Sequence, residues 1–240
     1  MKAMVLAAGL GTRLGVLGAA MPKILIDVGG RSLLARHVEF LVQLGVERIV
    51  INTHHHADQV EKSLSELQAA VDVTCVHEPE LLGTAGGVRN ALEALGPDPF
   101  VVMYGDVLFP DPMDGMIDAH APGGAAATLA VHSADSAVGK GVVETDATGG
   151  VVRFVEKGAG PAGPALINSG FYVLNPDVVE RVPAGTFSDF GRDVFPALLA
   201  EGAVIHTHRL PRPVIDIGTP EGLELARSLA GATPKLRGEV

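Results

Sequence analysis

The chain has 240 residues, of which 47% are hydrophobic, which is enough to bury one α/β core. Its 18 basic and 28 acidic residues give a formal net charge of −10, and no run of Lys or Arg occurs, which argues against nucleic acid or an anionic membrane as a partner. Cys75 is the only cysteine, so neither an intramolecular disulfide nor a cysteine-based zinc site is expected. The apolar N-terminal run stops at glycine too early for a signal peptide or a membrane span, which predicts a cytoplasmic location.

The first predicted element is a short buried strand over residues 4–8 that breaks into a glycine-rich turn. Gly9 and Gly11 allow backbone N–H groups to approach an anion without a Cβ in the way. Arg13 and Lys23 add one forked and one compact positive charge, a pair suited to a polyphosphate. A nucleotide loop is therefore predicted, although a strand-to-helix turn would explain the glycines alone. The spacing excludes both better-known phosphate loops: the pattern Gly-x-x-x-x-Gly-Lys-Ser/Thr is absent, and Leu14 stands where Gly9-x-Gly11 would need a third glycine.

Strands and helices then alternate along the chain. After an alternating segment, 24–28, Ser32 is expected to cap a helix, followed by a strand (48–52), a helix (57–68) and a strand (71–76). This order implies parallel pairing with helices on both faces. The histidine run 54–56 is interpreted as a polar loop rather than as a metal site, and a position lining the cleft stays open for one of the histidines.

Two further segments carry candidate chemistry. Residues 83–87 open a helix, leaving free N–H groups and a narrow slot suited to a planar base or an anion, or simply a tight helix entry. Strand 100–104 ends in Gly105-Asp106, which places a carboxylate at the edge where parallel sheets bind ligands. Asp106 is expected to hold Mg²⁺ against phosphate oxygens, with loop capping as the alternative.

The sequence pattern changes in the second half of the chain, where consecutive strands with a hairpin turn are predicted. Strands are predicted over 125–131, 141–145 and 151–156, with a hairpin turn at 146–150, and they are expected to form a lid or substrate wall. Glu156 and Lys157 offer an acceptor for sugar hydroxyls and a cation for a second phosphate, or alternatively an exposed ion pair. A mobile loop is expected over 158–164, a helix over 189–200 and a strand over 204–208.

The last motif is Asp216-Ile217-Gly218-Thr219-Pro220. Thr219 as N-cap with Pro220 at the first helical position predicts a helix start. Asp216 stands in an apolar strand, a costly place for a carboxylate, so it is expected either to pair with a basic side chain or to complete a metal site. The tail 233–240 is polar and expected to be loose.

The stretch Leu6-Ala7-Ala8-Gly9-x-Gly11-Thr12-Arg13-Leu14, followed by Pro22-Lys23, resembles the signature of the sugar-1-phosphate nucleotidyltransferases. Residues 82–86, 104–108, 155–157, 167–172 and 216–220 extend the resemblance over nearly the whole chain. One departure lies between the two cations: many members carry Pro and Thr where Val16 and Gly18 stand.

The resemblance implies a GT-A-like α/β fold: a Rossmann-like, mostly parallel (mixed) sheet flanked by helices, with a smaller β-rich sugar-binding part. A single domain (1–240) is expected, with a nucleotide half (1–120) and a sugar-phosphate half (121–232). The implied reaction joins a nucleoside triphosphate, GTP being favoured, to a heptose or mannose type of sugar 1-phosphate with Mg²⁺ as cofactor. Rival readings are a thymidylyl-, uridylyl- or cytidylyltransferase of the same family and a catalytically silent binding subunit. A homodimer is also among the expectations.

The resemblance assigns a role to each of the residues named in this paragraph. Charge and placement support that role independently for four of them only: Arg13, Lys23, Asp106 and Asp216. The catalytic residues implied are Arg13, Lys23 and Asp106, and the metal ligands are Asp106 and Asp216. The implied nucleotide-binding residues are Leu6, Ala8, Gly9, Gly11, Thr12, Arg13, Lys23, Gly83, Thr84, Gly87 and Asp106. The implied sugar-phosphate-binding residues are Tyr104, Gly105, Glu156, Lys157, Asn168 and Gly170.

Overall fold

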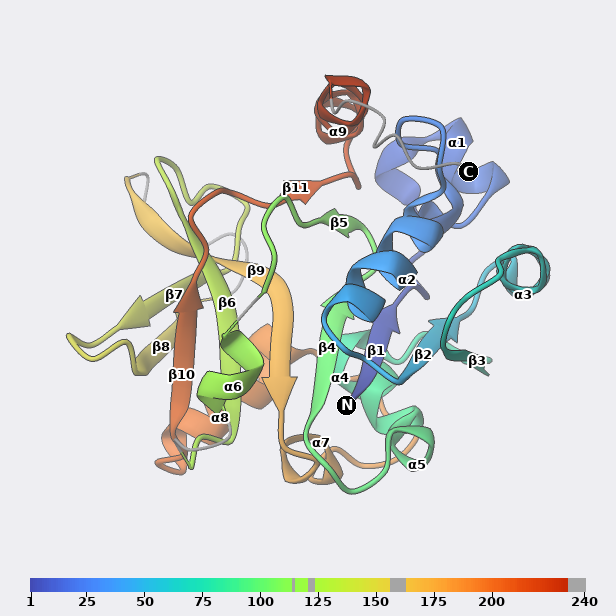
Figure 1. Cartoon of the computed structure of the whole chain (residues 1–240). Helices are drawn as coiled ribbons and strands as arrows, with labels where there is room; N and C mark the ends of the chain where they lie inside the picture. Colours follow the sequence, from blue (N-terminus) through green and yellow to red (C-terminus); the bar gives the residue numbers. More distant parts are fainter. Residues whose placement is uncertain (114, 121–123, 156–162, 233–240) are drawn as a thin grey trace.

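β1 (Lys2–Leu6) is an interior strand of the sheet, in a computed structural model that describes residues 1–113, 115–120, 124–155 and 163–232 (Figure 1). Its apolar residues are buried, and Val5 pairs in parallel register with Ile51 on one side and Met103 on the other. The neighbours are β2 (Arg48–Thr53), β3 (Asp72–His77) and β4 (Phe100–Tyr104), in the parallel order β3-β2-β1-β4. This parallel unit matches the predicted alternation of strands and helices.

Antiparallel strands extend the sheet beyond β4. β9 (Ala165–Leu174) runs antiparallel to both β4 and β6 (Ala127–Ala134), and β10 (Ile205–Arg209) pairs in parallel with β6. The hairpin of β7 (Val142–Thr145) and β8 (Val151–Val155) is attached to β9. The described strands therefore form a mixed sheet, which confirms the predicted fold class.

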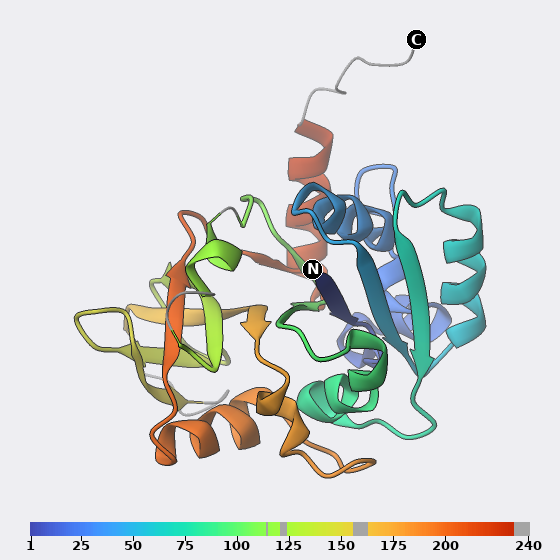
Figure 2. The same ribbon diagram turned by 60° about the horizontal axis from the view of Figure 1, so that its bottom comes forward.

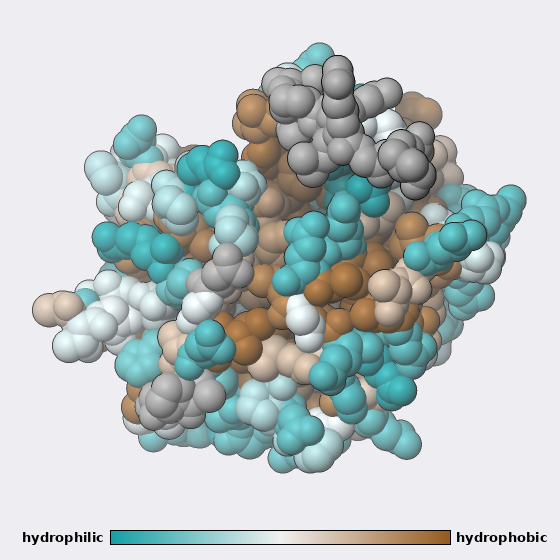
Figure 3. Space-filling view, viewed as in Figure 1, coloured by the Kyte–Doolittle hydropathy of each residue, from teal (hydrophilic) through white to brown (hydrophobic). Residues whose placement is uncertain are grey.

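Helices cover both faces of this sheet. One face is packed by α2 (Leu33–Gln43), α3 (Ala57–Glu66) and α6 (Met116–His120). The other is packed by α4 (Gly83–Asn90), α5 (Leu92–Leu95), α7 (Asp177–Glu180) and α8 (Phe195–Ala200), several of which lie in the lower half of Figure 2. As predicted, Ser32 caps α2, because its hydroxyl oxygen accepts from the Ala35 N–H at 3.2 Å. On the face shown in Figure 3, apolar residues gather across the middle and hydrophilic residues lie along the margins.

Two predicted segments differ in detail. Residues 24–28 form no regular strand: η2 (Lys23–Leu25) is a 3₁₀ turn, and alternate residues of the segment, Ile24, Ile26 and Val28, are buried all the same. The predicted helix 189–200 begins with a π-helical stretch, η4 (Phe190–Val194), before α8. Pro196 has no N–H to donate into the preceding turn, which accounts for a change of helical pitch there.

The C-terminal elements pack against segments from the first half of the chain. β11 (Ile215–Asp216) pairs antiparallel with β5 (Val107–Leu108), and α9 (Pro220–Ala232) follows. The Gly222 N–H donates to the Thr219 hydroxyl oxygen at 3.1 Å, which confirms the predicted helix start. Residues of α9 share a core cluster with Leu14, next to α1 (Val16–Ala20), and both views show α9 on this side of the molecule (Figures 1 and 2). Within the described ranges no helix is long and apolar enough to cross a membrane, and the tail 233–240 lies outside them.

Candidate functional site

A cleft of about 780 Å³ lies at the carboxyl ends of β1 and β4. The order of the parallel strands reverses around these two strands, and ligands of α/β sheets bind at such a switch point. Leu6 at the end of β1 and Tyr104 at the end of β4 both line the cleft, and Asn168 of β9 forms part of its far wall. The volume lies within the range of small-molecule sites.

Four charged side chains from distant parts of the sequence meet in this cleft. The Lys23 ammonium contacts Asp106 Oδ2 at 2.7 Å, and the Arg13 guanidinium contacts Asp216 Oδ2 at 3.4 Å. Gly218 keeps the space between them open: a Cβ there would lie 2.8 Å from Asp216 Oδ1, 2.9 Å from Arg13 and 3.3 Å from Asp106 Oδ2. The cleft thus contains two cation–carboxylate pairs around one small space, the space that a Cβ at Gly218 would fill, which is called the Gly218 cradle below.

The surroundings of Asp216 differ from the prediction of a carboxylate buried in an apolar strand. Ile215 and Ile217 are buried, but the Asp216 side chain between them is 49% exposed and faces the cleft. Strand alternation explains this, since neighbouring residues point to opposite sides. Asp216 pairs with Val107 across the β11–β5 ladder and is thereby placed beside Asp106. Of the two predicted outcomes, the structure contains the ion pair with a basic side chain.

The turn that carries Asp106 is held in place by contacts with β1 and α2. The Gly105 N–H donates to Leu6 O at 2.9 Å, and a Cβ at Gly105 would lie 2.6 Å from that oxygen, so the close approach requires glycine. His37 of α2 contacts Gly105 O through Nε2 at 3.1 Å. Burial lowers the pKa of His37 to about 4, so the ring is neutral and its Nε2–H donates to the carbonyl.

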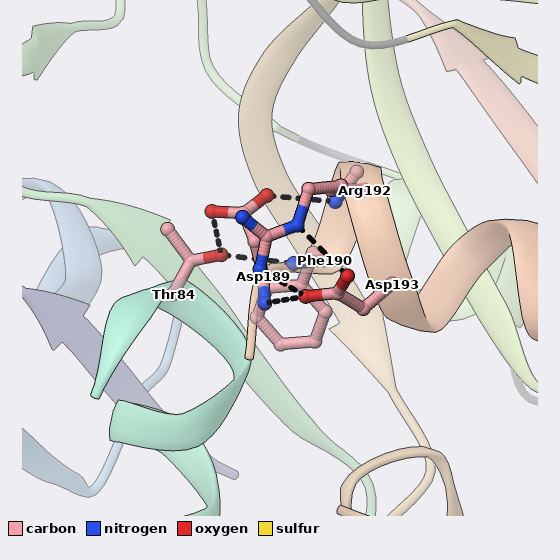
Figure 4. Close-up of polar contacts among 6 residues, drawn as sticks. Thr84, Asp189, Phe190, Arg192 and Asp193 are labelled. Atoms are coloured by element: carbon pink, nitrogen blue, oxygen red, sulfur yellow. Dashed lines mark hydrogen bonds and ion pairs between the residues drawn. The ribbon is translucent and has the colours of Figure 1, made fainter. Parts of the chain in front are cut away.

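The Gly83–Gly86 stretch docks against another loop instead of presenting free N–H groups. The N–H groups of Ala85 and Gly86 both donate to Ser188 O, at 3.0 and 3.1 Å. A Cβ at Gly83 would lie only 2.5 Å from the same oxygen, so glycine is needed for this contact. The predicted anion-binding role of these two N–H groups is therefore corrected. Thr84 points from the start of α4 to the Asp189 carboxylate, and both residues line the cleft (Figure 4).

A buried polar pair lies behind this end of the cleft. Asn52 accepts the Ala7 N–H at 2.7 Å and donates to Glu78 Oε1 at 2.6 Å, while the Leu82 N–H donates to Glu78 Oε2 at 3.1 Å. Together these contacts tie the end of β1 to the segment that opens α4. A Cβ at Gly87 would lie 2.6 Å from Glu78 Oε1, so Gly87 makes room for this carboxylate.

The opposite end of the cleft is built on β9. Gly170 has φ +72°, and a Cβ there would lie 2.8 Å from the Tyr104 ring, so both conformation and contact require glycine. Its N–H donates to Asn168 Oδ1 at 3.1 Å. His132 contacts the Ser169 hydroxyl through Nδ1 at 2.9 Å. Burial, followed by the nearby positive charge of Lys140, lowers the pKa of His132 to about 4.

Most of the predicted residues come together in the cleft. Those that line it are Leu6, Ala8, Gly9, Arg13, Lys23, Gly83, Thr84, Tyr104, Gly105, Asp106, Asn168, Gly170 and Asp216. Gly11, Thr12 and Gly87 do not line it, and Glu156, Lys157 and loop residues 158–162 lie outside the described residues. Sequence reasoning missed five further residues that line the cleft: Asn52, Glu78, His132, Lys140 and Asp189. Asn52 and His132 are polar residues inside apolar strands, Glu78 follows a strand and Asp189 precedes a helix, whereas Lys140 lies in a loop and has no such signal.

Gly11 has a structural role in the loop instead. A Cβ at Gly18 would lie 2.1 Å from Gly11 O, so the loop closes on itself at a backbone contact that only glycine permits. The glycine at position 18, where the sequence departs from the family pattern, is therefore a packing requirement of this loop. His56, with φ +54°, contacts Ala19 O through Nε2 at 3.0 Å and supports the loop from outside.

The histidine run 54–56 is a strand-end loop whose members make separate contacts. His54 contacts Glu78 O through Nδ1 at 2.7 Å, while His56 contacts Ala19 O at the end of α1. No group of three or more His, Cys, Asp and Glu that could hold a metal ion occurs in the described part of the chain. None of the three histidines lines the cleft.

A mixed α/β sheet with a cleft and paired cations and carboxylates at its switch point defines a ligand-binding α/β protein. The family model described as nucleotidyl transferase matches residues 2–230, and the chain belongs to that family. The earlier resemblance is thus confirmed at the level of the family.

Relatives narrow the comparison further. The probable mannose-1-phosphate guanylyltransferase 2 of Arabidopsis thaliana is 34% identical over 234 residues, covering 92% of this chain and 62% of the relative's own length. HddC from Yersinia pseudotuberculosis, solved in complex with GMP-PN, has a TM-score of 0.82 and 29% identity over 95% of this chain and 98% of its own. A putative glucose-1-phosphate thymidylyltransferase from Bacillus anthracis has a TM-score of 0.87 at 23% identity, a likeness of fold alone.

Proposed function

We propose that the protein transfers a nucleotidyl group from a nucleoside triphosphate to a sugar 1-phosphate, releasing pyrophosphate. The carrying observation is the pair of cation–carboxylate contacts, Lys23–Asp106 and Arg13–Asp216, around the Gly218 cradle. Two cations set between separate walls of one cleft suit a reaction that must align two polyanions.

The two ion pairs suggest how the site changes when substrate arrives. Each of the two cations is paired with one carboxylate. A triphosphate offers Lys23 and Arg13 more negative charge than a single carboxylate does, so the cations exchange partners and their carboxylates are released. The released Asp106 and Asp216 then present oxygen atoms to the same cradle at Gly218.

The residues present fit a magnesium ion. Mg²⁺ prefers oxygen ligands and is often bound through one or two carboxylates together with substrate phosphates. Asp106 and Asp216 offer two such carboxylates, and both approach the space that a Cβ at Gly218 would fill. When bound, the ion neutralises phosphate charge as the leaving group departs. Asp106 and Asp216 are proposed to hold it.

The proposed reaction requires little covalent chemistry from the protein itself. An oxygen of the sugar 1-phosphate forms a bond to the α-phosphorus, and the bond from that phosphorus to the bridging oxygen of pyrophosphate breaks. Lys23, deep in the cleft, steadies the α-phosphate, and the more exposed Arg13 steadies the departing pyrophosphate. Thr84 and Gly83 are assigned to the base end, and Asn168 to the sugar end.

GTP is the proposed nucleotide, and a mannose or heptose type of sugar 1-phosphate is the proposed acceptor. The names of the 34% identical relatives support the guanylyl transfer and mannose 1-phosphate, and the GMP-PN complex of HddC supports a guanine nucleotide. The chain spans 62% of the length of those curated relatives, so their activity enters here as a proposal.

The test is pyrophosphate release in the presence of Mg²⁺. GTP, dTTP, UTP, CTP and ATP are each combined with mannose, glucose and heptose 1-phosphate, and every combination is repeated with a chelator. The expected result is a chelator-sensitive signal with GTP and with mannose or heptose 1-phosphate. A signal with another nucleotide would overturn the guanylyl assignment and retain nucleotidyl transfer. Silence in every combination would overturn the proposed reaction.

A further inference from the structure

One exposed aromatic ring lies at the cleft. Of the eight phenylalanines and two tyrosines, all of which fall in the described ranges, only Phe187 is exposed. It is 56% exposed and lines the cleft together with Leu81 and Gly83. A single exposed apolar residue is common on protein surfaces. Phe187 differs from such residues in its place at a ligand cleft and in the contacts that hold it there.

The backbone on either side of Phe187 is fixed against the start of α4. The Ser188 N–H donates to Leu82 O at 2.9 Å, and Ser188 O accepts two N–H groups of α4. On the other side, a Cβ at Gly86 would lie 2.5 Å from Thr186 O, so the two segments are in backbone contact. Phe187 is therefore carried by a loop that is held both before and after it.

The ring of Phe187 is restrained at an edge and on one face. Its Cζ atom lies so close to Gly83 that a Cβ there would be 3.1 Å away. The Arg192 guanidinium lies over the ring, 5.3 Å from its centroid, within the range of a cation–π contact. Asp193 orients this guanidinium, because it accepts from Nε and from Nη2 at 2.8 Å each (Figure 4). The ring is thus held in place while more than half of the residue stays exposed.

A restrained aromatic ring with an open face is suited to stacking. Arg192 lies over one face of Phe187, which leaves the opposite face for a ligand. Planar rings stack on such a face in an offset arrangement, and every nucleobase has a π-face that can do so. Because the ring is already restrained, little side-chain entropy is lost when a ligand stacks on it.

The position of Phe187 favours the base of the nucleotide over the sugar as the stacked group. Phe187 contacts Gly83 at the start of α4, whereas Asn168 and Gly170 belong to the opposite end of the cleft, on β9. The lining residues beside the ring, Leu81 and Gly83, offer apolar surface and no side-chain hydrogen-bonding group. Sugar hydroxyls need hydrogen-bond partners when they are buried, but the face of a base does not.

We propose that Phe187 is the residue on which the base of the nucleotide stacks, held in position by Arg192 and Gly83. This inference rests on the proposed function, because it assigns a residue to the nucleotide of that reaction. Stacking tolerates any base, so Phe187 contributes affinity for the nucleoside whichever base the cleft selects. It makes no contribution to the binding of the phosphates.

The first test separates the base from the phosphates. Binding of GTP and of tripolyphosphate, each with Mg²⁺ and without sugar phosphate, is measured by calorimetry. Phe187→Ala is expected to weaken GTP binding about tenfold, the equivalent of one base–aromatic stack, and to leave tripolyphosphate binding unchanged. Unchanged GTP affinity, or an equal loss for tripolyphosphate, would overturn the proposal.

Val152→Ala is the matched control for this comparison. Val152 is 57% exposed on β8, nearly the same exposure as Phe187, and does not line the cleft. The control is expected to bind both ligands as the unsubstituted protein does. A loss of GTP affinity as large as that of Phe187→Ala would show that the effect is not specific to the ring and would overturn the proposal.

The second test reports stacking directly. The chain has no tryptophan, so Phe187→Trp introduces a single indole at the ring position, and Val152→Trp places one outside the cleft. A guanine base stacked on an indole quenches its fluorescence. GTP is expected to quench Phe187→Trp, whereas tripolyphosphate is not, and Val152→Trp is expected to stay unchanged with both. Binding of GTP to Phe187→Trp without quenching, or equal quenching of the two variants, would overturn the proposal.

Kinetics distinguish the base from the sugar. Phe187→Ala is expected to raise the KM for GTP about tenfold at saturating mannose 1-phosphate and to leave the KM for mannose 1-phosphate unchanged. The reverse pattern would place the ring against the sugar and would overturn the proposal. If the unsubstituted protein bound GTP but released no pyrophosphate with any substrate pair, the proposed reaction would fail, while calorimetry and fluorescence would still decide the stacking. If it bound no nucleotide, both would fail.

Discussion

Asp216 is the residue whose role depends most on its surroundings. It is half exposed and paired with Arg13 across the Gly218 cradle. The chain offers a matched pair elsewhere: Asp72 and Arg48 contact each other at 2.9 Å with similar exposure, but at the starts of β3 and β2, the opposite edge of the sheet. Comparing the two pairs separates a catalytic carboxylate from an ordinary surface ion pair.

Asp216→Asn is expected to lower kcat/KM on the order of 100-fold, because a preorganised charge at the reacting phosphates is lost. It should also raise the Mg²⁺ concentration needed for half-maximal rate. Pyrophosphate release measured over a magnesium series checks both effects. Asp72→Asn is the control and should retain the unsubstituted rate; equal rates for both variants would contradict a catalytic role for Asp216.

His37 and His132 give the protein a predictable response to acid. Burial lowers the pKa of each to about 4 from an ordinary value of 6.5, so the unfolded chain binds more protons than the folded one between these values. The free energy of unfolding should therefore fall as the pH falls from 6.5 towards 4. Above pH 6.5 both states are neutral at these positions, and no such slope is expected.

Urea unfolding at pH 7, 6 and 5 tests this expectation, since most carboxylates remain ionised over that range. The free energy of unfolding should depend less steeply on pH in His132→Gln, because glutamine keeps a polar side chain near Ser169 but cannot be protonated. A free energy of unfolding that is constant between pH 7 and pH 5 would contradict the lowered pKa values.

At the scale of elements, the short β5–β11 ladder positions the two carboxylates of the cleft. It pairs Asp216 with Val107 and thereby brings the C-terminal motif to the turn after β4. The Ile217 N–H also donates to Asp106 O at 3.0 Å. The helix that follows, α9, is capped by Thr219 and packs its Leu223 on the cluster that contains Leu14. Both carboxylates are thus fixed by backbone pairing.

Gly218→Ala tests the cradle between these elements. The added Cβ would approach Asp216 Oδ1 at 2.8 Å and Arg13 at 2.9 Å, so these side chains must move apart. The rate at limiting Mg²⁺ is expected to fall about tenfold or more, in the same direction as for Asp216→Asn, because misplacing charged groups by a fraction of an ångström weakens electrostatic catalysis. Thermal unfolding serves as the check on folding, and an unchanged magnesium dependence in the folded variant would argue against the cradle.

For the whole molecule, the cleft joins the parallel strands β1 and β4 to β9 of the antiparallel part. A ligand that spans the cleft contacts both parts and binds only the folded chain. With GTP, Mg²⁺ and mannose 1-phosphate at about 100 times their dissociation constants, each binding event adds about 2.7 kcal/mol to the free energy of unfolding. The Tm should rise by several degrees, about 2–4 °C per kcal/mol for a chain of this size.

Thermal unfolding with each ligand alone and with non-reacting combinations checks this expectation. Guanosine with Mg²⁺ is the control, because it lacks the phosphates that Lys23 and Arg13 would bind. An unchanged Tm at GTP concentrations that saturate the reaction rate would contradict binding in this cleft.

Much of this architecture was predictable from local patterns. The parallel strands, α2 with its Ser32 cap and α9 with its Thr219 cap follow from apolar periodicity and from hydrogen bonds within a few residues of the chain. The cations Arg13 and Lys23 and the carboxylates Asp106 and Asp216 were identifiable because each stands at the end or beginning of a recognisable element.

Other features could not be read from a single sequence, because they depend on which segments meet. The N–H groups that open α4 looked free until residues 186–189 folded against them and Ser188 O accepted two of them. Asn52, Glu78 and Asp189 are ordinary polar residues in sequence and become part of the site through contacts 26 to 105 positions away along the chain.

The sequence by itself determined the family, the strand and helix order and the four charges of the site, since these depend on residue type and short spacing. Only the tertiary structure decided that Asp216 is exposed and paired with Arg13, that the loop after β1 closes on itself where Gly18 meets Gly11, and that the Tyr172 hydroxyl donates to the Tyr104 hydroxyl. The physical reason is the same in each case: burial, hydrogen-bond partners and van der Waals contact are set by the distances between segments far apart in the chain.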